Sequence, residues 1–198
     1  VRLRISNGGA LINTSATTAI YPGVVALGSS ASIVGETGLI TLNNTTVTGG
    51  IQGSTYTLTL GGTKGGSIST IIGVMGAVTK VDAGIWTLSG ANTYGGTTKI
   101  NVGVVNVQHS TSLGTIAAGT EVVGNAALEI QGDINISYEA LALRGYGVSS
   151  AGALRNISGN NTYGGLITLS SLGGTEIASD AGTLTLTGGV TGAFGLTI

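Results

Sequence analysis

Several ingredients of common protein classes are scarce in this 198-residue sequence. It contains no cysteine, which excludes a disulfide framework and thiolate metal sites. Charged residues make up 8% of the chain and the net charge is −1, so there is no basic surface for nucleic acid or anionic lipid. The longest nearly continuous apolar run is residues 71–78, far shorter than the roughly 18 residues of a membrane-spanning helix. We therefore expect neither nucleic-acid binding nor a membrane span in this sequence.

What the sequence has instead is glycine and apolar residues in short runs. There are 37 glycines and 41% hydrophobic residues, beside one proline and 4% aromatics. A disordered chain would be poor in apolar residues and rich in charge, so this sequence is expected to fold. Each glycine would destabilise a helix by roughly 1 kcal/mol. Apolar residues alternate with Thr, Asn or Lys, which is the pattern of strands with one buried face.

The sequence also contains an internal repeat. Residues 9–15 (GALINTS) return as residues 152–158 (GALRNIS), and three further blocks return in the same order at similar offsets. Such repetition predicts a tandem array whose units stack to bury a shared core. We therefore predict one continuous solenoid over 1–198. Within it, 1–140 would be one repeat unit and 141–198 the start of the next.

These observations predict an all-β fold, a right-handed parallel β-solenoid of stacked short-strand coils. A β-propeller would repeat every 40–50 residues or so, and a β-sandwich does not explain a unit that restarts in phase. With about 20 residues per coil, the chain would form about ten coils spaced at about 4.8 Å. Gly and Asn suit the corners because both tolerate positive φ. Stacked Asn side chains are expected to form ladders from coil to coil.

Strand alternation assigns side chains to the inside or the outside of the solenoid. The residues predicted to anchor the core are Leu58, Leu60, Trp86, Leu88, Ile100, Val102, Leu184 and Leu186. The residues predicted to point outward are Thr57, Thr59, Thr87, Lys99 and Thr185. Both ends of the sequence are strand-like, so we expect each to continue the stack in another coil, of the same chain or of an identical neighbour. The residues predicted to make this end-to-end stacking are Val1, Leu3, Ile5, Leu196 and Ile198.

No combination of residues predicts a catalytic, cofactor-binding or metal site. His109 is the only histidine and lies in a polar stretch, so a Ser–His pair or a metal site is not expected there. Glu129 and Asp133 lie on either side of a Gln-Gly turn, with no Arg or Lys within ten residues of them. Paired carboxylates without basic partners are weak candidates for polysaccharide chemistry. We expect no enzymatic activity, no cofactor and no metal.

Three aromatic residues stand out as candidate ligand contacts. Trp86 is the only tryptophan and lies on an alternating strand, which predicts a buried core anchor rather than an exposed sugar-stacking ring. Tyr94 and Tyr163 each lie between Thr and Gly-Gly. Both are predicted to cover a coil corner rather than to bind a ligand.

Residues 78–107 resemble the autotransporter-associated β-strand repeat. The recurring pattern of that family is L-T-K-x-G-x-G-T-W-T-L-S-G-x-N-T-Y-T-G-x-T-x-I-x-x-G-T-L-x-V. This sequence carries VTKVDAG, IWTLSG, ANTYGG, TTKINVG and VVNV in the same order, and departs from the pattern at Gly95 and Val104, where Thr is usual. A second partial copy at 158–165 (SGNNTYGG) lacks the Trp element. The resemblance implies a passenger region secreted by the type V route to the bacterial cell surface.

Three classes of function remain open from the sequence. The first, which we favour, is a structural extracellular fibre or stalk that assembles or continues head-to-tail into filaments. The second is a specific adhesin that binds a glycan or a surface protein. An adhesin should interrupt the coil rhythm, and the irregular candidates are 110–119 and 145–152. The third is a polysaccharide-active enzyme or an ice-binding solenoid, and the ice-binding reading needs outward Thr in register on successive coils.

Overall fold

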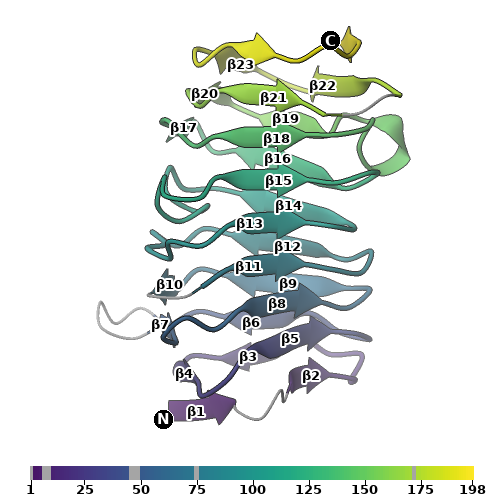
Figure 1. The fold of residues 1–198 in the computed structure, drawn as a ribbon. Coiled ribbons are helices and arrows are strands. Elements are labelled where there is room, and N and C mark those ends of the chain that lie inside the picture. Colours follow the sequence, from purple (N-terminus) through teal and green to yellow (C-terminus); the bar gives the residue numbers. More distant parts are fainter. Residues whose placement is uncertain (1, 6–9, 45–49, 74–75, 171–172) are drawn as a thin grey trace.

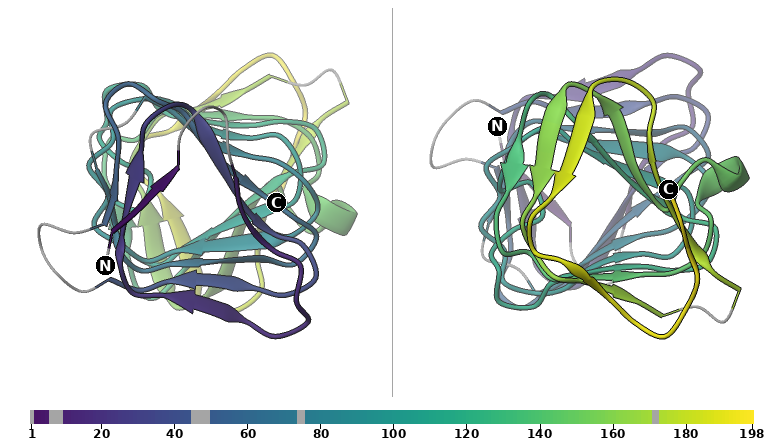
Figure 2. Two further views of the ribbon diagram at one scale, coloured as in Figure 1. Left: turned by 90° about the horizontal axis from the view of Figure 1, so that it is seen from below. Right: turned by 90° about the horizontal axis from the view of Figure 1, so that it is seen from above.

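The chain winds into a right-handed coil with three faces, and successive coils stack along one axis (Figure 1). Viewed from the N-terminal end, the chain runs clockwise as it recedes (Figure 2, left). The computed structural model describes residues 2–5, 10–44, 50–73, 76–170 and 173–198. The strand pairings in these segments are parallel. The predicted all-β parallel solenoid is therefore confirmed.

Faces B and C are each one sheet that runs along the rod, whereas face A holds two shorter sheets. Face A consists of β1 Arg2–Ile5, β4 Val24–Leu27, β7 Gly50–Gln52 and β10 Ile71–Gly73, and further along of β17 Asn135–Ile136, β20 Asn160–Tyr163 and β23 Thr183–Leu186. Face B consists of β2 Ala10–Asn13, β5 Ala31–Gly35, β8 Leu58–Gly61, β11 Val78–Lys80, β13 Thr98–Ile100, β15 Thr120–Val122, β18 Leu141–Leu143, β21 Ile167–Leu169 and β24 Val190–Thr191. Face C consists of β3 Ala19–Tyr21, β6 Ile40–Leu42, β9 Gly65–Ile68, β12 Ile85–Leu88, β14 Val104–Val107, β16 Ala127–Gln131, β19 Leu154–Ser158, β22 Thr175–Ser179 and β25 Leu196–Thr197.

Helical structure in the described segments is limited to a single 3₁₀ turn, η1 Val148–Ser150. It protrudes at the corner between faces B and C, within the irregular stretch 145–152 (Figure 1). None of the helical structure described is long and apolar enough to cross a membrane.

The rod has fewer coils than the sequence suggested. Faces B and C contain nine strands each, which makes about eight turns instead of about ten. The reason is that coil length varies and that most coils are longer than the 20 residues expected. The hydrogen-bonded neighbours Gly62 and Asp82 are 20 residues apart, whereas Thr63 and Glu36 are 27 residues apart.

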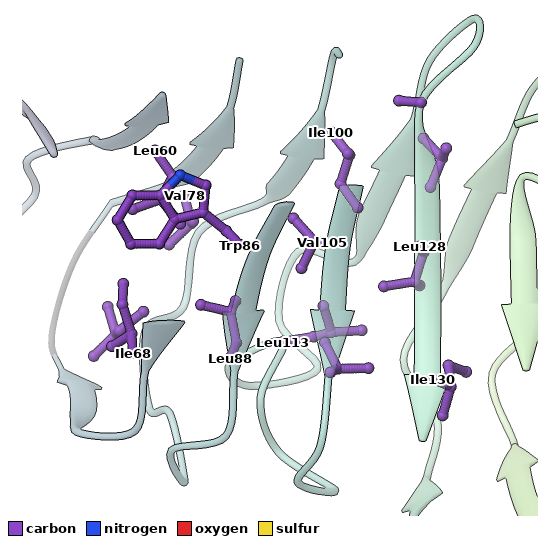
Figure 3. Packing of buried hydrophobic residues seen from close by; sticks show 14 of the residues in the cluster. Leu60, Ile68, Val78, Trp86, Leu88, Ile100, Val105, Leu113, Leu128 and Ile130 are labelled. Carbon is purple, nitrogen blue, oxygen red and sulfur yellow. The ribbon is translucent and has the colours of Figure 1, made fainter. Parts of the chain in front are cut away.

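The core is one continuous column of apolar side chains inside the coil (Figure 3). Five of the predicted core residues have no exposed surface, namely Leu58, Leu60, Trp86, Leu88 and Ile100. Leu184 and Leu186 of β23 pack against the core but are only half-buried. The reason is that β23 is the last strand of its sheet and is covered by a paired strand, β20, on one side only. Among the predicted outward residues, Thr57, Thr59, Thr87 and Lys99 are half-exposed and Thr185 is exposed.

Val102 was expected in the core and instead is 48% exposed. The strand β13 ends at Ile100, and residues 101–103 form the corner that leads to β14. Alternation between inside and outside holds only along a strand, so it does not extend past Ile100.

Trp86 fits the core because the preceding coil has a glycine beside it. Gly66 of β9 pairs with Trp86 of β12, and a Cβ at Gly66 would lie 3.0 Å from two carbons of the indole ring. The same Cβ would lie 2.2 Å from the Ile40 carbonyl oxygen. The indole Nε1–H donates to the carbonyl oxygen of Gly61 at 3.0 Å, which satisfies its polar atom inside the core.

Buried asparagines connect one coil to the next, although not as the expected ladder of stacked amides. Asn92 accepts a hydrogen bond from the Ile72 N–H at 2.8 Å and donates to the Ser112 carbonyl at 2.6 Å, so it bridges three successive coils. Asn161 accepts from the Ile134 N–H at 2.7 Å in the same way. Both asparagines precede Thr-Tyr in the sequence, so in both copies this motif satisfies a backbone N–H of the preceding coil.

Replacing Asn92 by alanine is expected to lower the free energy of unfolding by about 1–3 kcal/mol, because a buried N–H and a buried carbonyl lose their partner. Urea denaturation followed by circular dichroism would measure the change. The matched control is Asn125→Ala, which alters an exposed asparagine and should have little effect. Equal stability of the two variants would contradict the bridging role.

Three of the predicted end-to-end stacking residues, Leu3, Ile5 and Leu196, lie on the outermost strands. Val1 is outside the described residues, and Leu3 and Ile5 belong to β1, which pairs with β4. Leu196 of β25 packs against the core and Ile198 is 91% exposed. Stacking of these residues on further coils stays a prediction.

The predicted repeat boundary at residue 140 falls inside the stack. The strands β15 and β18 on either side of it are paired in register. The two segments that begin the predicted units contain β1 and β18, which lie on faces A and B respectively. The division into 1–140 and 141–198 is not tested by these pairings and stays a prediction.

Candidate functional surface

Two of the residues considered as candidates for catalysis form hydrogen bonds with the protein backbone. Glu129 and Asp133 do not form an isolated pair, because Asp133 accepts a hydrogen bond from the Asn160 N–H at 2.7 Å. His109 Nδ1 lies 3.2 Å from the backbone nitrogen of Thr111, which donates to it. These contacts hold loop backbone in place, as expected for corner residues.

Glu129 has a basic partner that lies too far away in the sequence to be predicted from it. Arg155 of the next coil lies 3.6 Å from the Glu129 carboxylate and forms two hydrogen bonds to Asp180, at 2.9 and 2.6 Å. Asn106 of the preceding coil donates to Glu129 at 3.1 Å. Four successive coils of face C are thus joined by one polar network, and the hydrogen bonds to Asp180 raise the pKa of Arg155.

Tyr94 and Tyr163 lie inside the solenoid instead of covering its corners. Both side chains are fully buried, and the Tyr94 hydroxyl lies 2.6 Å from the Thr98 hydroxyl. Burial raises the pKa of both tyrosines, and the nearby Glu139 carboxylate adds to the rise. The corner prediction was wrong because alternation along face A places these rings with the inward side chains, as the pairing of Ile136 with Tyr163 shows.

Glu139 is a buried carboxyl group that the sequence did not single out. It is 3% exposed, and the Thr120 hydroxyl donates to it at 2.9 Å. Burial raises its pKa, and the hydrogen bond from Thr120 acts in the opposite direction. The signal that could have found it is a departure from the Thr-Tyr-Gly-Gly motif. Four residues lie between Ile136 and Leu141, whereas three lie between their partners Tyr163 and Ile167, so this corner holds an extra residue.

Lys80 is a second buried ionisable group. It occupies an inward position of face B between Leu60 and Ile100 and has no exposed surface. Its ammonium donates to the carbonyl oxygens of Val81 and Asp82 at 2.6 Å each, and to that of Val102 at 3.1 Å. Burial lowers the pKa of Lys80 to about 8, although the Asp82 carboxylate opposes this. The ammonium thereby ties the corner of one coil to that of the next.

Face A has a hollow where its ladder is interrupted. Between β10 and β17 the chain crosses this face without forming regular strands (Figure 1). Single backbone hydrogen bonds connect the coils here, from the Thr93 N–H to the Ile72 carbonyl and from the Thr115 N–H to the Tyr94 carbonyl, at 2.9 Å each. The hollow is lined among others by Thr93, Ser110, Leu113, Ile116, Ser137 and Glu139. The irregular stretch 110–119 therefore forms one of its walls.

A second hollow adjoins the first, and the two share Ser137. It is lined by Asn135, Ser137, Tyr138, Gly164 and Thr187. Tyr138 is 77% exposed and has a φ of 61°, in the left-handed region that tyrosine rarely adopts. We refer to the two hollows together as the face A groove. The described residues contain no group of three or more His, Asp or Glu side chains placed to hold a metal ion.

Comparison with known families identifies the central coils. Residues 78–107 match the passenger-associated-transport-repeat. The resemblance inferred from the sequence is confirmed. The matched segment extends from β11 to β14, and it contains four residues whose contacts join one coil to another, namely Lys80, Trp86, Asn92 and Tyr94.

A longer similarity extends on both sides of the passenger repeat. The chain is 31% identical over 194 residues to the adhesin BmaC autotransporter of Brucella suis biovar 1 (strain 1330). The match covers 87% of this chain and 6% of that protein, so the chain spans a small part of the curated relative that it matches. No solved structure matches the chain.

Proposed function

We propose that this chain is a stretch of an autotransporter passenger that forms a structural rod outside the bacterial cell. The observation that carries the proposal is the parallel stack itself, with nine paired strands on each of faces B and C. Such a stack has length and lateral surface, and each coil contacts only its neighbours. The passenger repeat at 78–107 supports the extracellular location.

We propose further that the stack continues head-to-tail through neighbouring repeats. The backbone groups of the outermost strands are available for such pairing. The relative, of which the match covers 6%, supports continuation within one chain over assembly of identical subunits. A denaturing gel of protein sheared from cells should show a mass far above 19.3 kDa. Filaments that dissolve into 19.3-kDa subunits would favour non-covalent assembly instead.

The rod can be tested by removing a whole coil from the full-length protein. Deleting residues 98–119 joins Thr97 to Thr120 and removes β13 and β14, so the following strands keep their faces. Deleting residues 98–108 removes only part of a coil and rotates every later strand onto a wrong face. We expect antibody labelling of intact cells to persist in the first variant and to be lost in the second. Equal labelling of both variants, or none on unmodified cells, would contradict the proposal.

Adhesion is a second candidate function, and two observations favour it. The relative named above is an adhesin, and the face A groove places an exposed aromatic ring beside hydroxyl and amide groups. The proposal is non-enzymatic in either case. It is supported by the Glu129 and Asp180 carboxylates, which are engaged by Arg155 in a network that links coils.

A further inference from the structure

Tyr138 is placed in a way that folding alone does not explain. Its ring is 77% exposed, so burial of the side chain contributes little to stability. Its backbone has a φ of 61°, which is unfavourable for a residue with a Cβ. A glycine would suit this corner better, and the neighbouring coil has Gly164 beside it. Backbone strain at an exposed aromatic residue points to a surface function.

The surroundings of Tyr138 define the chemistry of a ligand. Asn135, Ser137 and Thr187 line the same hollow and offer amide and hydroxyl groups. The Ser137 hydroxyl donates to Asn135 Oδ1 at a long 3.4 Å, so both groups retain bonding capacity. A flat ring flanked by donors and acceptors fits a sugar, which has an apolar face and a rim of hydroxyls.

The groove is long enough for a chain of sugars. Its two hollows include residues from coils that contain Thr93, Thr115, Ser137, Gly164 and Thr187. Successive coils are about 4.8 Å apart, so five coils span roughly 19 Å along the rod. Among the described residues that line either hollow, the one charged side chain is that of Glu139, in the first hollow, and its negative charge disfavours a sulfated or sialylated ligand.

We propose that the face A groove binds a neutral oligosaccharide, with Tyr138 stacking on a sugar ring and Asn135 and Ser137 bonding its hydroxyls. This inference deepens the adhesin candidate and rests on it. The structural-rod proposal is tested separately by the coil deletions, so either can fail alone.

The test is binding of the 198-residue chain to immobilised neutral oligosaccharides, including cellohexaose, maltohexaose and chitohexaose, beside heparin and sialyllactose. We expect micromolar to millimolar binding to at least one neutral probe and none to the two acidic probes. Tyr138→Gly should weaken binding at least tenfold, while its melting temperature stays equal or rises because glycine accepts the left-handed backbone. Tyr138→Phe keeps the ring and should bind within threefold of the original chain.

Two further variants locate the site. Asn135→Ala combined with Ser137→Ala should weaken binding at least fivefold. Tyr146→Ala removes the exposed ring of the corner between faces B and C, and should leave binding unchanged. The inference is overturned by absence of binding to every neutral probe, by preference for an acidic probe, or by unchanged affinity in Tyr138→Gly.

Discussion

Replacing Trp86 by alanine is expected to lower the free energy of unfolding by about 3–5 kcal/mol, the range for emptying a large core site. The indole has no exposed surface and belongs to the column of core side chains (Figure 3). Its space is fixed by Gly66 of the preceding coil, so neighbouring side chains cannot easily fill the void. The Gly61 carbonyl would also lose its donor. Equilibrium denaturation in guanidinium, followed by far-ultraviolet circular dichroism, would measure the loss.

The adjacent residue offers a matched control for Trp86. Ile85 is 49% exposed on the same strand, so Ile85→Ala should change stability by less than about 0.5 kcal/mol. Gly66→Ala should also destabilise, because the new methyl group would meet the Ile40 carbonyl at 2.2 Å. If Trp86→Ala cost no more than Ile85→Ala, the packing described for this coil would be wrong.

Stability is expected to rise with pH between about 8 and 10 because of Lys80. Its pKa is lowered to about 8 by burial, from the ordinary value of 10.5. Below pH 8 both folded and unfolded chains carry the proton, and the folded state bears the full cost of the buried charge. Between pH 8 and 10.5 the unfolded chain binds more protons than the folded chain, so the free energy of unfolding increases, by at most about 1.4 kcal/mol per pH unit.

The buried tyrosines should reverse this trend at higher pH. Burial raises the pKa of Tyr94 and Tyr163, so above pH 10 the unfolded chain loses protons that the folded chain keeps. Stability then falls with pH, which gives a maximum near pH 10. Urea denaturation at half-unit steps from pH 7 to 11 would trace the curve. In Lys80→Met the rise should vanish and the fall remain, whereas Lys64→Met, at an exposed lysine, should keep both. A rise that persists in Lys80→Met would assign it to another group.

Local alternation predicted the inward residues that lie within strands. Leu58, Leu60 and Trp86 follow the strand period and are buried. The same period places Lys80 inside, in line with Val78, although a lysine side chain is rarely buried. Its ammonium is satisfied by the neighbouring Val81 and Asp82 carbonyls and by the Val102 carbonyl of the following coil, 22 residues away. No local pattern contains that contact.

The face A groove could not be predicted because its walls come from different coils. Thr93, Ser110 and Glu139 meet there only after the lengths of the coils between them are known. Those lengths vary between 20 and 27 residues, so spacing along the sequence does not give register. The pairing of Arg155 with Asp180, 25 residues apart, was concealed for the same reason.

The direction of the hydrogen bonds determines how such a rod responds to pulling. The strands run across the axis, so the bonds between coils lie along it, and tension applied to the two ends opens them one coil at a time. Each opened coil releases 20 to 27 residues of chain. At about 3.4 Å per extended residue, that is roughly 70–90 Å of slack for every 4.8 Å or so of rod height lost. Under load this solenoid would lengthen in steps and dissipate force, and a surface attached through it would be held by an extensible tether.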